Sequence, residues 1–296
     1  RSLCDWSSDV CSSDLYDASR NSWVWLAGEE FFEDPRFGYY SFSCQMIDAI
    51  LEAAPYHLLV RSAGNDRNER GTAEGQPYLI ENTEFTEHRQ PDGGEDGYDC
   101  IPQVGVGKNV LTVGAVFSIP DGYSEPSDVV MSSFSGWGPA DDGRIKPDIV
   151  ASGVNIASAY YIPSQDPETD LIRPISGTSM STPAVTGSLA LLQEYYTKLS
   201  EGTFLKAASL KGLIIHTADE AGDNPGPDYQ FGWGLMNTNT AAQVLKNSLE
   251  SDSELFSEES LSNQDTFEQM IFVPGDKALT GTICWTDPAG IPIFTN

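Results

Sequence analysis

Residues 176–183 read Ser-Gly-Thr-Ser-Met-Ser-Thr-Pro, and a long stretch of small and apolar side chains follows them. This pattern predicts a helix over 179–199 that is apolar or small nearly all round at its start, as in a helix inside a domain. Pro183 falls near the first turn, where its missing N–H costs little. Unpaired N–H groups and the dipole at a helix start favour negative charge. Ser179 is therefore a candidate nucleophile, but serine is also a favoured N-cap, so a capping role stays open.

Short apolar segments alternate with helical patterns around this motif. Residues 58–60, 110–116 and 145–151 are typical of buried strands, and residues 43–54 and 205–217 have the apolar spacing of helices. Strands that alternate with helices predict an α/β fold with a mostly parallel central sheet.

The motif and several other segments resemble subtilisin-like serine proteases (subtilases, peptidase S8). Residues 177–183 are similar to the Gly-Thr-Ser-Met-Ala-x-Pro signature around the nucleophile of that family. Further similar segments follow the family's order: 62–65 (SAGN), 110–116 (VLTVGAV), 134–139 (FSGWGP), 146–150 (KPDIV) and 231–237 (FGWGLMN). The resemblance covers about residues 40–245. It implies a three-layer subtilisin-like fold and a serine endopeptidase that hydrolyses peptide bonds through an acyl-enzyme.

The resemblance also implies a role for individual residues. Ser179 would be the nucleophile, and the Asn65 amide would complete the oxyanion hole. Substrate contacts are expected from Ser62, Ala63, Gly64 and Thr178. An Asn after a Gly is also typical of a turn in left-handed conformation, so Asn65 has that simpler interpretation as well.

The sequence departs from the family at two helix positions and lacks two catalytic motifs. Ser181 stands where the family usually has Ala, and Ala184 stands where many members have His. The family also needs an Asp and a His upstream of the Asn, and residues 16–64 contain neither Asp-Thr-Gly, Asp-Ser-Gly nor His-Gly-Thr-His. We therefore expect the catalytic Asp and His to be encoded upstream, and this chain alone to be inactive and poorly folded.

The sequence contains three histidines that are candidates for the missing catalytic base. His57 precedes a strand where the family has a structural residue, His88 lies in a polar insertion, and His216 lies in a late helix. None of these places suits a catalytic base. The remaining alternatives are a pseudo-protease that only binds peptides and another serine hydrolase. The spacing Gly-x-Ser-x-Ser differs from the Gly-x-Ser-x-Gly of α/β-hydrolases and disfavours the latter.

The sequence divides into four parts. Residues 1–15 resemble a translated sequencing adapter and are set aside as non-native. The expected parts are a partial catalytic domain (16–247) with an inserted surface loop (66–107), an acidic linker (248–266) and the start of a C-terminal domain (267–296). Strands are expected at 270–273 and 279–285. Residues 281–290 resemble the opening of a jelly-roll-like β-sandwich, which implies a fragment of a large secreted bacterial subtilase.

The net charge of the chain limits the classes of partner that it can bind. A net charge of −28, from 44 acidic and 16 basic residues, disfavours nucleic acid and anionic membranes. Solubility explains it, but bound divalent cations remain open. Residues 92–99 place carboxylates among glycines, which suits either Ca²⁺ or a solvated loop. We expect protein or peptide substrates, no required cofactor, no membrane span, a monomer and an extracellular location.

The cysteines do not define a disulfide framework. Once residues 1–15 are set aside, Cys44, Cys100 and Cys284 remain, an odd number. Cys44 lies in a helical pattern and is expected to be a buried thiol, while a bridge between Cys44 and Cys100 stays open.

Overall fold

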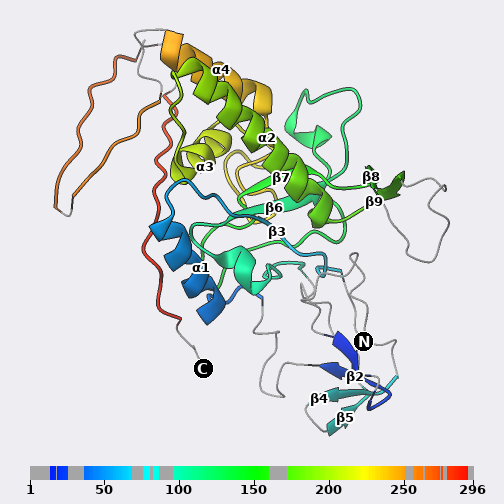
Figure 1. Cartoon of the computed structure of the whole chain (residues 1–296). Helices are drawn as coiled ribbons and strands as arrows, with labels where there is room; N and C mark the ends of the chain where they lie inside the picture. Colours follow the sequence, from blue (N-terminus) through cyan, green and yellow to red (C-terminus); the bar gives the residue numbers. More distant parts are fainter. Residues whose placement is uncertain are drawn as a thin grey trace.

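A computed structural model of the chain shows a central parallel sheet of three strands (Figure 1). It describes residues 14–17, 19–25, 37–68, 76–80, 83–86, 96–159, 172–250, 256–262, 264–273, 275 and 279–292. The strands are β3 (Val60–Ser62), β6 (Leu111–Val116) and β7 (Ile149–Ser152), in the order β3-β6-β7. Every residue of β6 is buried, as expected for the middle of a parallel sheet that is covered on both faces.

Helices cover both faces of this sheet, which gives three layers (Figure 1). On one face lie α2 (Thr178–Leu199), α3 (Ala207–His216) and α4 (Thr238–Glu250). On the other lie α1 (Phe42–Ala53) and the short 3₁₀ helix η1 (Gln103–Val106). The predicted α/β class and parallel sheet are therefore confirmed.

The larger core lies between the sheet and α2, α3 and α4. Its buried side chains come from alternate positions of β6 and β7 and from the inner faces of the three helices: Leu111, Val113, Ile149, Ala151, Val185, Leu189, Leu192, Leu210, Leu213, Ile214, Ala241 and Leu245. A smaller core on the α1 face contains Cys44, Ala63, Ile101, Val106 and Ala140. Val116 and Val150, which alternate with the residues of the larger core along β6 and β7, belong to a third cluster with Val129, Ala221 and Phe231.

Helix α1 forms where it was predicted, but two of its large apolar side chains are exposed and an aspartate is buried. Met46 and Ile50 are 51% and 60% exposed, whereas Cys44, Asp48 and Leu51 are buried. Asp48 turns inward because its carboxylate accepts the backbone N–H groups of residues 108 and 109, both at 2.9 Å, and the Tyr40 hydroxyl at 2.8 Å. These hydrogen bonds satisfy a buried charge that an apolar periodicity cannot predict.

The remaining elements are short. The strands β1 (Asp14–Asp17), β2 (Ser22–Trp25), β4 (Tyr78–Ile80) and β5 (Thr83–Phe85) form a separate sheet, β8 (Ile156–Ala159) pairs with β9 (Ile172–Ile175), and η2 is Pro126–Asp128. The insertion was predicted as a surface loop, yet its last part is buried. Cys100, Ile101 and Val106 have no exposed surface, and the last two pack in the core beside Cys44 of α1.

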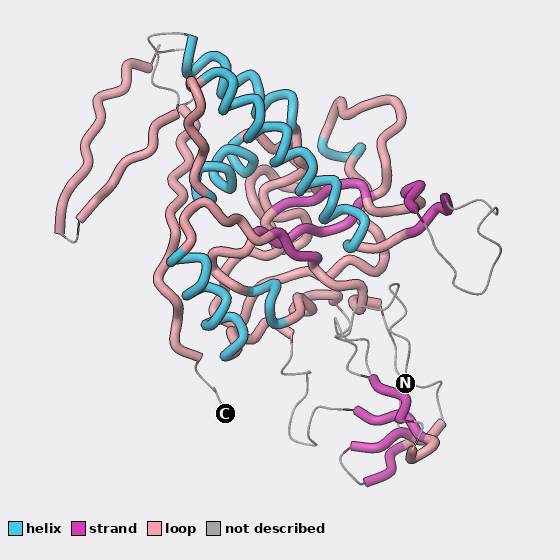
Figure 2. The backbone as a smooth tube through the Cα atoms, viewed as in Figure 1, coloured by secondary structure: helices cyan, strands magenta, loops and turns pink. Residues whose placement is uncertain are grey.

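The segment after α4 contains no strand among its described residues (Figure 2). The strands predicted at 270–273 and 279–285 are therefore not found. Residues 279–292 instead run past α3 and α1, where side chains of the domain take up their backbone hydrogen bonds. Gln45 Nε2 donates to Gly290 O at 2.9 Å, and Asn109 bonds both Asp287 N and Asp287 O at 2.8 Å. We call residues 279–292 the C-terminal strap.

Two further expectations concern the whole chain. Cys44, Cys100 and Cys284 are free thiols, and the first two are fully buried, so the considered bridge between Cys44 and Cys100 is absent. Among the described residues, no helix is both long and apolar enough to cross a membrane.

Candidate active site

The carboxyl ends of β3 and β7 bring Asn65 next to the start of α2. Strand β3 ends at Ser62, and Asn65 lies three residues further on. Strand β7 ends at Ser152, and the carbonyl of the next residue, Gly153, accepts the Gly177 N–H at 2.8 Å. Residues that follow parallel strands gather at one edge of the sheet, which is where α/β proteins usually place their sites.

The turn before α2 requires a glycine. Gly177 is the N-cap and has φ 156° and ψ 158°, a region that is essentially restricted to glycine. A Cβ here would lie 3.6 Å from Asn65 Nδ2, an ordinary contact, so the backbone conformation rather than a clash excludes other residues. This conformation directs the first residues of α2 toward the Asn65 side chain.

Thr178 holds the Asn65 amide in one orientation. The Thr178 backbone N–H donates to Asn65 Oδ1 at 2.8 Å, and the Thr178 hydroxyl donates to the same oxygen at 3.0 Å. Because both donors require an oxygen acceptor, they fix which end of the amide is Oδ1. The NH₂ group of Asn65 is consequently turned away from Thr178.

Ser179 follows at the second position of α2 and is partly exposed. Since Gly177 is the N-cap, the interpretation of Ser179 as a capping residue is wrong. Its backbone N–H belongs to the first turn, whose N–H groups have no partner within a helix. Among the described residues, nothing forms a hydrogen bond with the Ser179 hydroxyl.

The environments of three further residues of α2, Ser181, Pro183 and Ala184, are visible in the structure. Ser181 is fully buried, and its hydroxyl donates to Thr178 O at 2.9 Å, so the polar group is satisfied. Ala184 is exposed. Pro183 lies inside α2 rather than in its first turn, so its missing N–H leaves the Ser179 carbonyl without an i+4 donor.

The predicted substrate-contact residues differ in their burial and in which of their atoms can face a substrate. Ser62 and Thr178 are buried, and Gly64 has φ 90°. The Ala63 side chain packs into the core beside Cys44, which leaves only its main chain to face a substrate. The Gly64 carbonyl accepts the Gly136 N–H at 3.0 Å, so the 134–139 loop supports this segment.

Sequence reasoning missed one support of this loop, an arginine. Arg67 lies over the Trp137 ring, 3.9 Å from its centroid, and donates to the carbonyls of Ser132 and Ser135 at 2.8 Å. An Arg two residues after Asn65 and a Trp in the loop were visible, but nothing in the spacing of 67 and 137 signalled their contact.

The described histidines lie elsewhere. His57 borders a cavity at the opposite, amino edge of the sheet, and His216 Nδ1 lies 3.0 Å from Thr282 Oγ1 in the C-terminal strap. His88 and most of the proposed Ca²⁺ loop, including Asp92, fall outside the described residues. Within the described ranges, no group of three His, Cys, Asp or Glu residues could hold a metal ion.

Comparisons with known proteins identify the family. The sequence model of the subtilase family (peptidase S8) matches residues 22–234. Relatives include the serine protease/ABC transporter B family protein tagA of Dictyostelium discoideum, 28% identical over 193 residues (57% of this chain, 11% of the relative). The subtilisin-like protease SBT5.3 of Arabidopsis thaliana is 35% identical over 130 residues (38% and 16%), and a C5a peptidase of Streptococcus pyogenes is 43% identical over 70 residues (24% and 6%).

Solved structures give a consistent but looser likeness. The Clostridium perfringens CspB protease is 28% identical with a TM-score of 0.43, over 55% of this chain and 31% of that one. The patellamide maturation protease PatA is 22% identical with a TM-score of 0.46, over 71% and 59%. The chain spans less than two thirds of each of these relatives and structures. Because the family match extends over most of the sequence, the chain belongs to the subtilase family of serine proteases.

Proposed function

We propose that Ser179 is the nucleophile and Asn65 the oxyanion donor of a serine endopeptidase. The observation that carries the proposal is the pair of hydrogen bonds from Thr178 to Asn65 Oδ1, at 2.8 and 3.0 Å. These bonds orient the amide beside the start of α2, one residue before Ser179. A nucleophile and a fixed N–H donor are thereby brought to one edge of the sheet.

The chemistry follows from these positions. The Ser179 oxygen would attack the carbonyl carbon of a peptide bond, and its proton would pass to a base and then to the leaving amine, leaving an acyl-enzyme. The negative oxygen of the tetrahedral intermediate would accept hydrogen bonds from Asn65 Nδ2 and the Ser179 N–H. One such donor contributes about 3 kcal/mol, a magnitude known from the corresponding Asn of a subtilisin.

The base and the carboxylate that orients it would come from sequence upstream of this chain. The described histidines support this proposal, because His57 lines the cavity at the amino edge of the sheet and His216 contacts Thr282, another residue of that lining. Serine without a base is a weak nucleophile, so we expect the 296-residue chain alone to be inactive.

The broader setting is also proposed. The chain would be a fragment of a large secreted bacterial enzyme. This enzyme would act outside the cell, as a monomer, on protein or peptide substrates, and the acidic composition of the chain agrees with such a location. It would need no cofactor, and Ca²⁺ bound by residues 92–99 would be structural. Residues 267–296 would open a C-terminal β-sandwich.

An active-site serine probe on the protein with its upstream sequence tests the proposal. A fluorophosphonate should label the protein, and Ser179→Ala should abolish labelling. Ser181→Ala is the matched control, since this serine lies on the same helix but is fully buried, and it should still be labelled. No labelling of the folded protein would favour the peptide-binding pseudo-protease, and labelling that survives Ser179→Ala would overturn the assignment.

A further inference from the structure

The amino edge of the parallel sheet carries a cavity of about 470 Å³. Its lining includes residues that come just before each strand, such as Leu58 before β3, Asn109 before β6 and Ile145 before β7, and the C-terminal strap forms one wall. Asn65 and Ser179 lie together at the other edge of the sheet. The length of β6, about 20 Å, separates that edge from the cavity. The cavity is therefore not part of the proposed active site.

The cavity gathers positive charge in a very acidic chain. Of the sixteen Lys and Arg residues, four line it: Lys108, Arg144, Lys146 and Lys211. Only two carboxylates, those of Asp148 and Asp287, are in the lining. Arg144 is paired with Asp142 outside the lining at 2.9 Å, and Lys108 is paired with Asp287 at 3.2 Å. The local excess is therefore one positive charge, although the chain as a whole carries −28.

At the floor of the cavity, one carboxylate forms ion pairs with two ammonium groups. Asp148 Oδ2 lies 2.7 Å from Lys146 Nζ, and Asp148 Oδ1 lies 2.9 Å from Lys211 Nζ. The Asp148 and Lys146 side chains are only 4% and 2% exposed, while Lys211, at 11%, borders the open space. Burial lowers the pKa of Lys146 to about 8. Buried charges are normally balanced, and this group of three retains one unbalanced positive charge.

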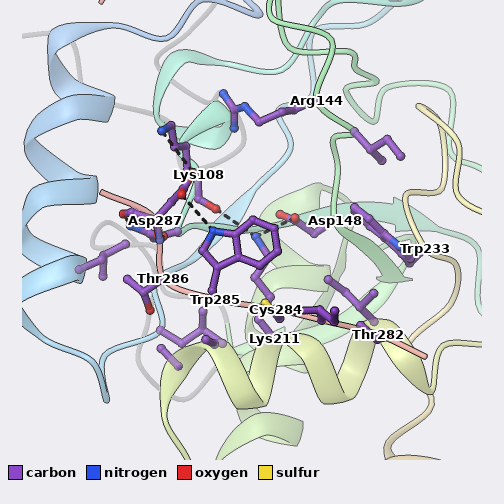
Figure 3. Close-up of a pocket in the computed structure, with 18 of the residues that line it drawn as sticks. Lys108, Arg144, Asp148, Lys211, Trp233, Thr282, Cys284, Trp285, Thr286 and Asp287 are labelled. Atoms are coloured by element: carbon purple, nitrogen blue, oxygen red, sulfur yellow. Dashed lines mark hydrogen bonds and ion pairs between the residues drawn. The ribbon is translucent and has the colours of Figure 1, made fainter. Parts of the chain in front are cut away.

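A second ammonium group stands at the rim. The Lys108 side chain is 26% exposed, and its Nζ has two contacts within the described structure, to Pro288 O and Asp287 Oδ2, both at 3.2 Å. An ammonium has three N–H donors, so one remains for a ligand. Figure 3 shows the Trp285 ring in the middle of this region, with Lys108 to its left and Asp148 to its right.

The rest of the lining is largely apolar. Trp285 and Trp233 contribute rings, and Ile145, Ile215 and Leu58 contribute aliphatic surface. Apolar walls with a few convergent polar groups are typical of small-molecule sites. Such walls suit a ligand with an apolar body rather than a fully hydrated ion such as inorganic phosphate.

We propose that this cavity binds a small carboxylate with an aromatic or aliphatic body. The carboxylate would accept the remaining N–H of Lys108, and the body would pack against Trp285 and Trp233. Lys211 Nζ already donates to Lys108 O, Val110 O and Asp148 Oδ1, so it would attract the carboxylate through the excess positive charge of its group of three rather than through a hydrogen bond. The proposal goes beyond the proteolytic function and does not depend on it, because the two sites occupy opposite edges of the sheet.

A pair of matched probes tests the proposal on the protein with its upstream sequence. 3-Phenylpropanoate and the neutral 3-phenylpropan-1-ol share the same body, and isothermal titration calorimetry would give both dissociation constants. We expect the acid to bind about tenfold tighter or more, and this preference to shrink as salt is added. Equal binding of acid and alcohol, or no binding of the acid, would overturn the proposal.

Variants locate the site. Lys108→Gln should weaken binding of the acid about tenfold and leave the alcohol unchanged. Lys198→Gln, an exposed lysine on α2, is the control and should bind like the unmodified chain. Lys211→Met leaves one positive charge, on Lys146, to one negative charge, on Asp148. It should therefore weaken binding of the acid as well. If this variant does not fold, Lys108→Gln decides alone, and unchanged binding there would refute the assignment.

Discussion

The orientation of Asn65 by Thr178 gives the sharpest prediction. Thr178→Val keeps the shape of the side chain and the backbone hydrogen bond at 2.8 Å, but it removes the hydroxyl that donates at 3.0 Å. Loss of one of the two neutral hydrogen bonds that hold the amide should cost about 1 kcal/mol. This corresponds to a loss of about fivefold in kcat/KM. Because Asn65 would act mainly on the transition state, the loss should appear in kcat rather than in KM.

A double-mutant cycle separates this positioning role from general destabilisation. The assay is hydrolysis of a chromogenic peptide by the protein with its upstream sequence. In an Asn65→Leu background, Thr178→Val should cost less than about twofold, since the group it orients is gone. Thr182→Val is the control, because that hydroxyl donates to Thr178 O at 2.8 Å and not to Asn65, so it should leave kcat nearly unchanged. An equal loss from Thr178→Val in both backgrounds would refute the reasoning.

Two further predictions concern folding. Gly177→Ala places a side chain at φ 156°, which should destabilise the chain by about 1–3 kcal/mol in urea unfolding. Gly187→Ala is the control, since its Cβ meets nothing within 4 Å, and it should stabilise α2 by up to about 1 kcal/mol; equal effects would contradict the assigned strain. Burial lowers the pKa of Lys146 from 10.5 to about 8, so between these values the unfolded chain holds a proton that the folded chain has lost. The contribution of Lys146 to stability should therefore rise with pH over this window. Urea unfolding at both ends of the window should show a smaller rise in Lys146→Met, and an unchanged rise would exclude Lys146 as its source.

Much of the fold was predictable because its signals are local. The helix expected at 179–199 is found at Thr178–Leu199, and the strand expected at 110–116 is found at Leu111–Val116. A run of apolar or small residues bounded by glycine or proline specifies such elements without knowledge of their neighbours. The candidate residues Asn65 and Ser179 were also nominated by local motifs, and the fold brings their segments together.

Other features depended on distant partners and could not be read locally. The buried face of α1 is set by Asp48, which bonds residues 108 and 109, about sixty positions along the chain. Ile101 and Val106 were predicted to lie in a surface loop, but they pack in a core beside Cys44 of α1. The strap was predicted to contain a strand, but a strand needs a neighbouring strand for its backbone hydrogen bonds, and here side chains such as Asn109 supply them instead.

The sequence by itself determined the family and the position of the helix that carries Ser179, since these follow from residue types at neighbouring positions. Only the tertiary structure showed that Thr178 holds the Asn65 amide, that Ser179 is not the cap, and that four cations meet at the amino edge of the sheet. The physical reason is that hydrogen bonds and charge balance depend on distances in space. Folding alone brings residues 65 and 178, or 108 and 211, within reach of one another.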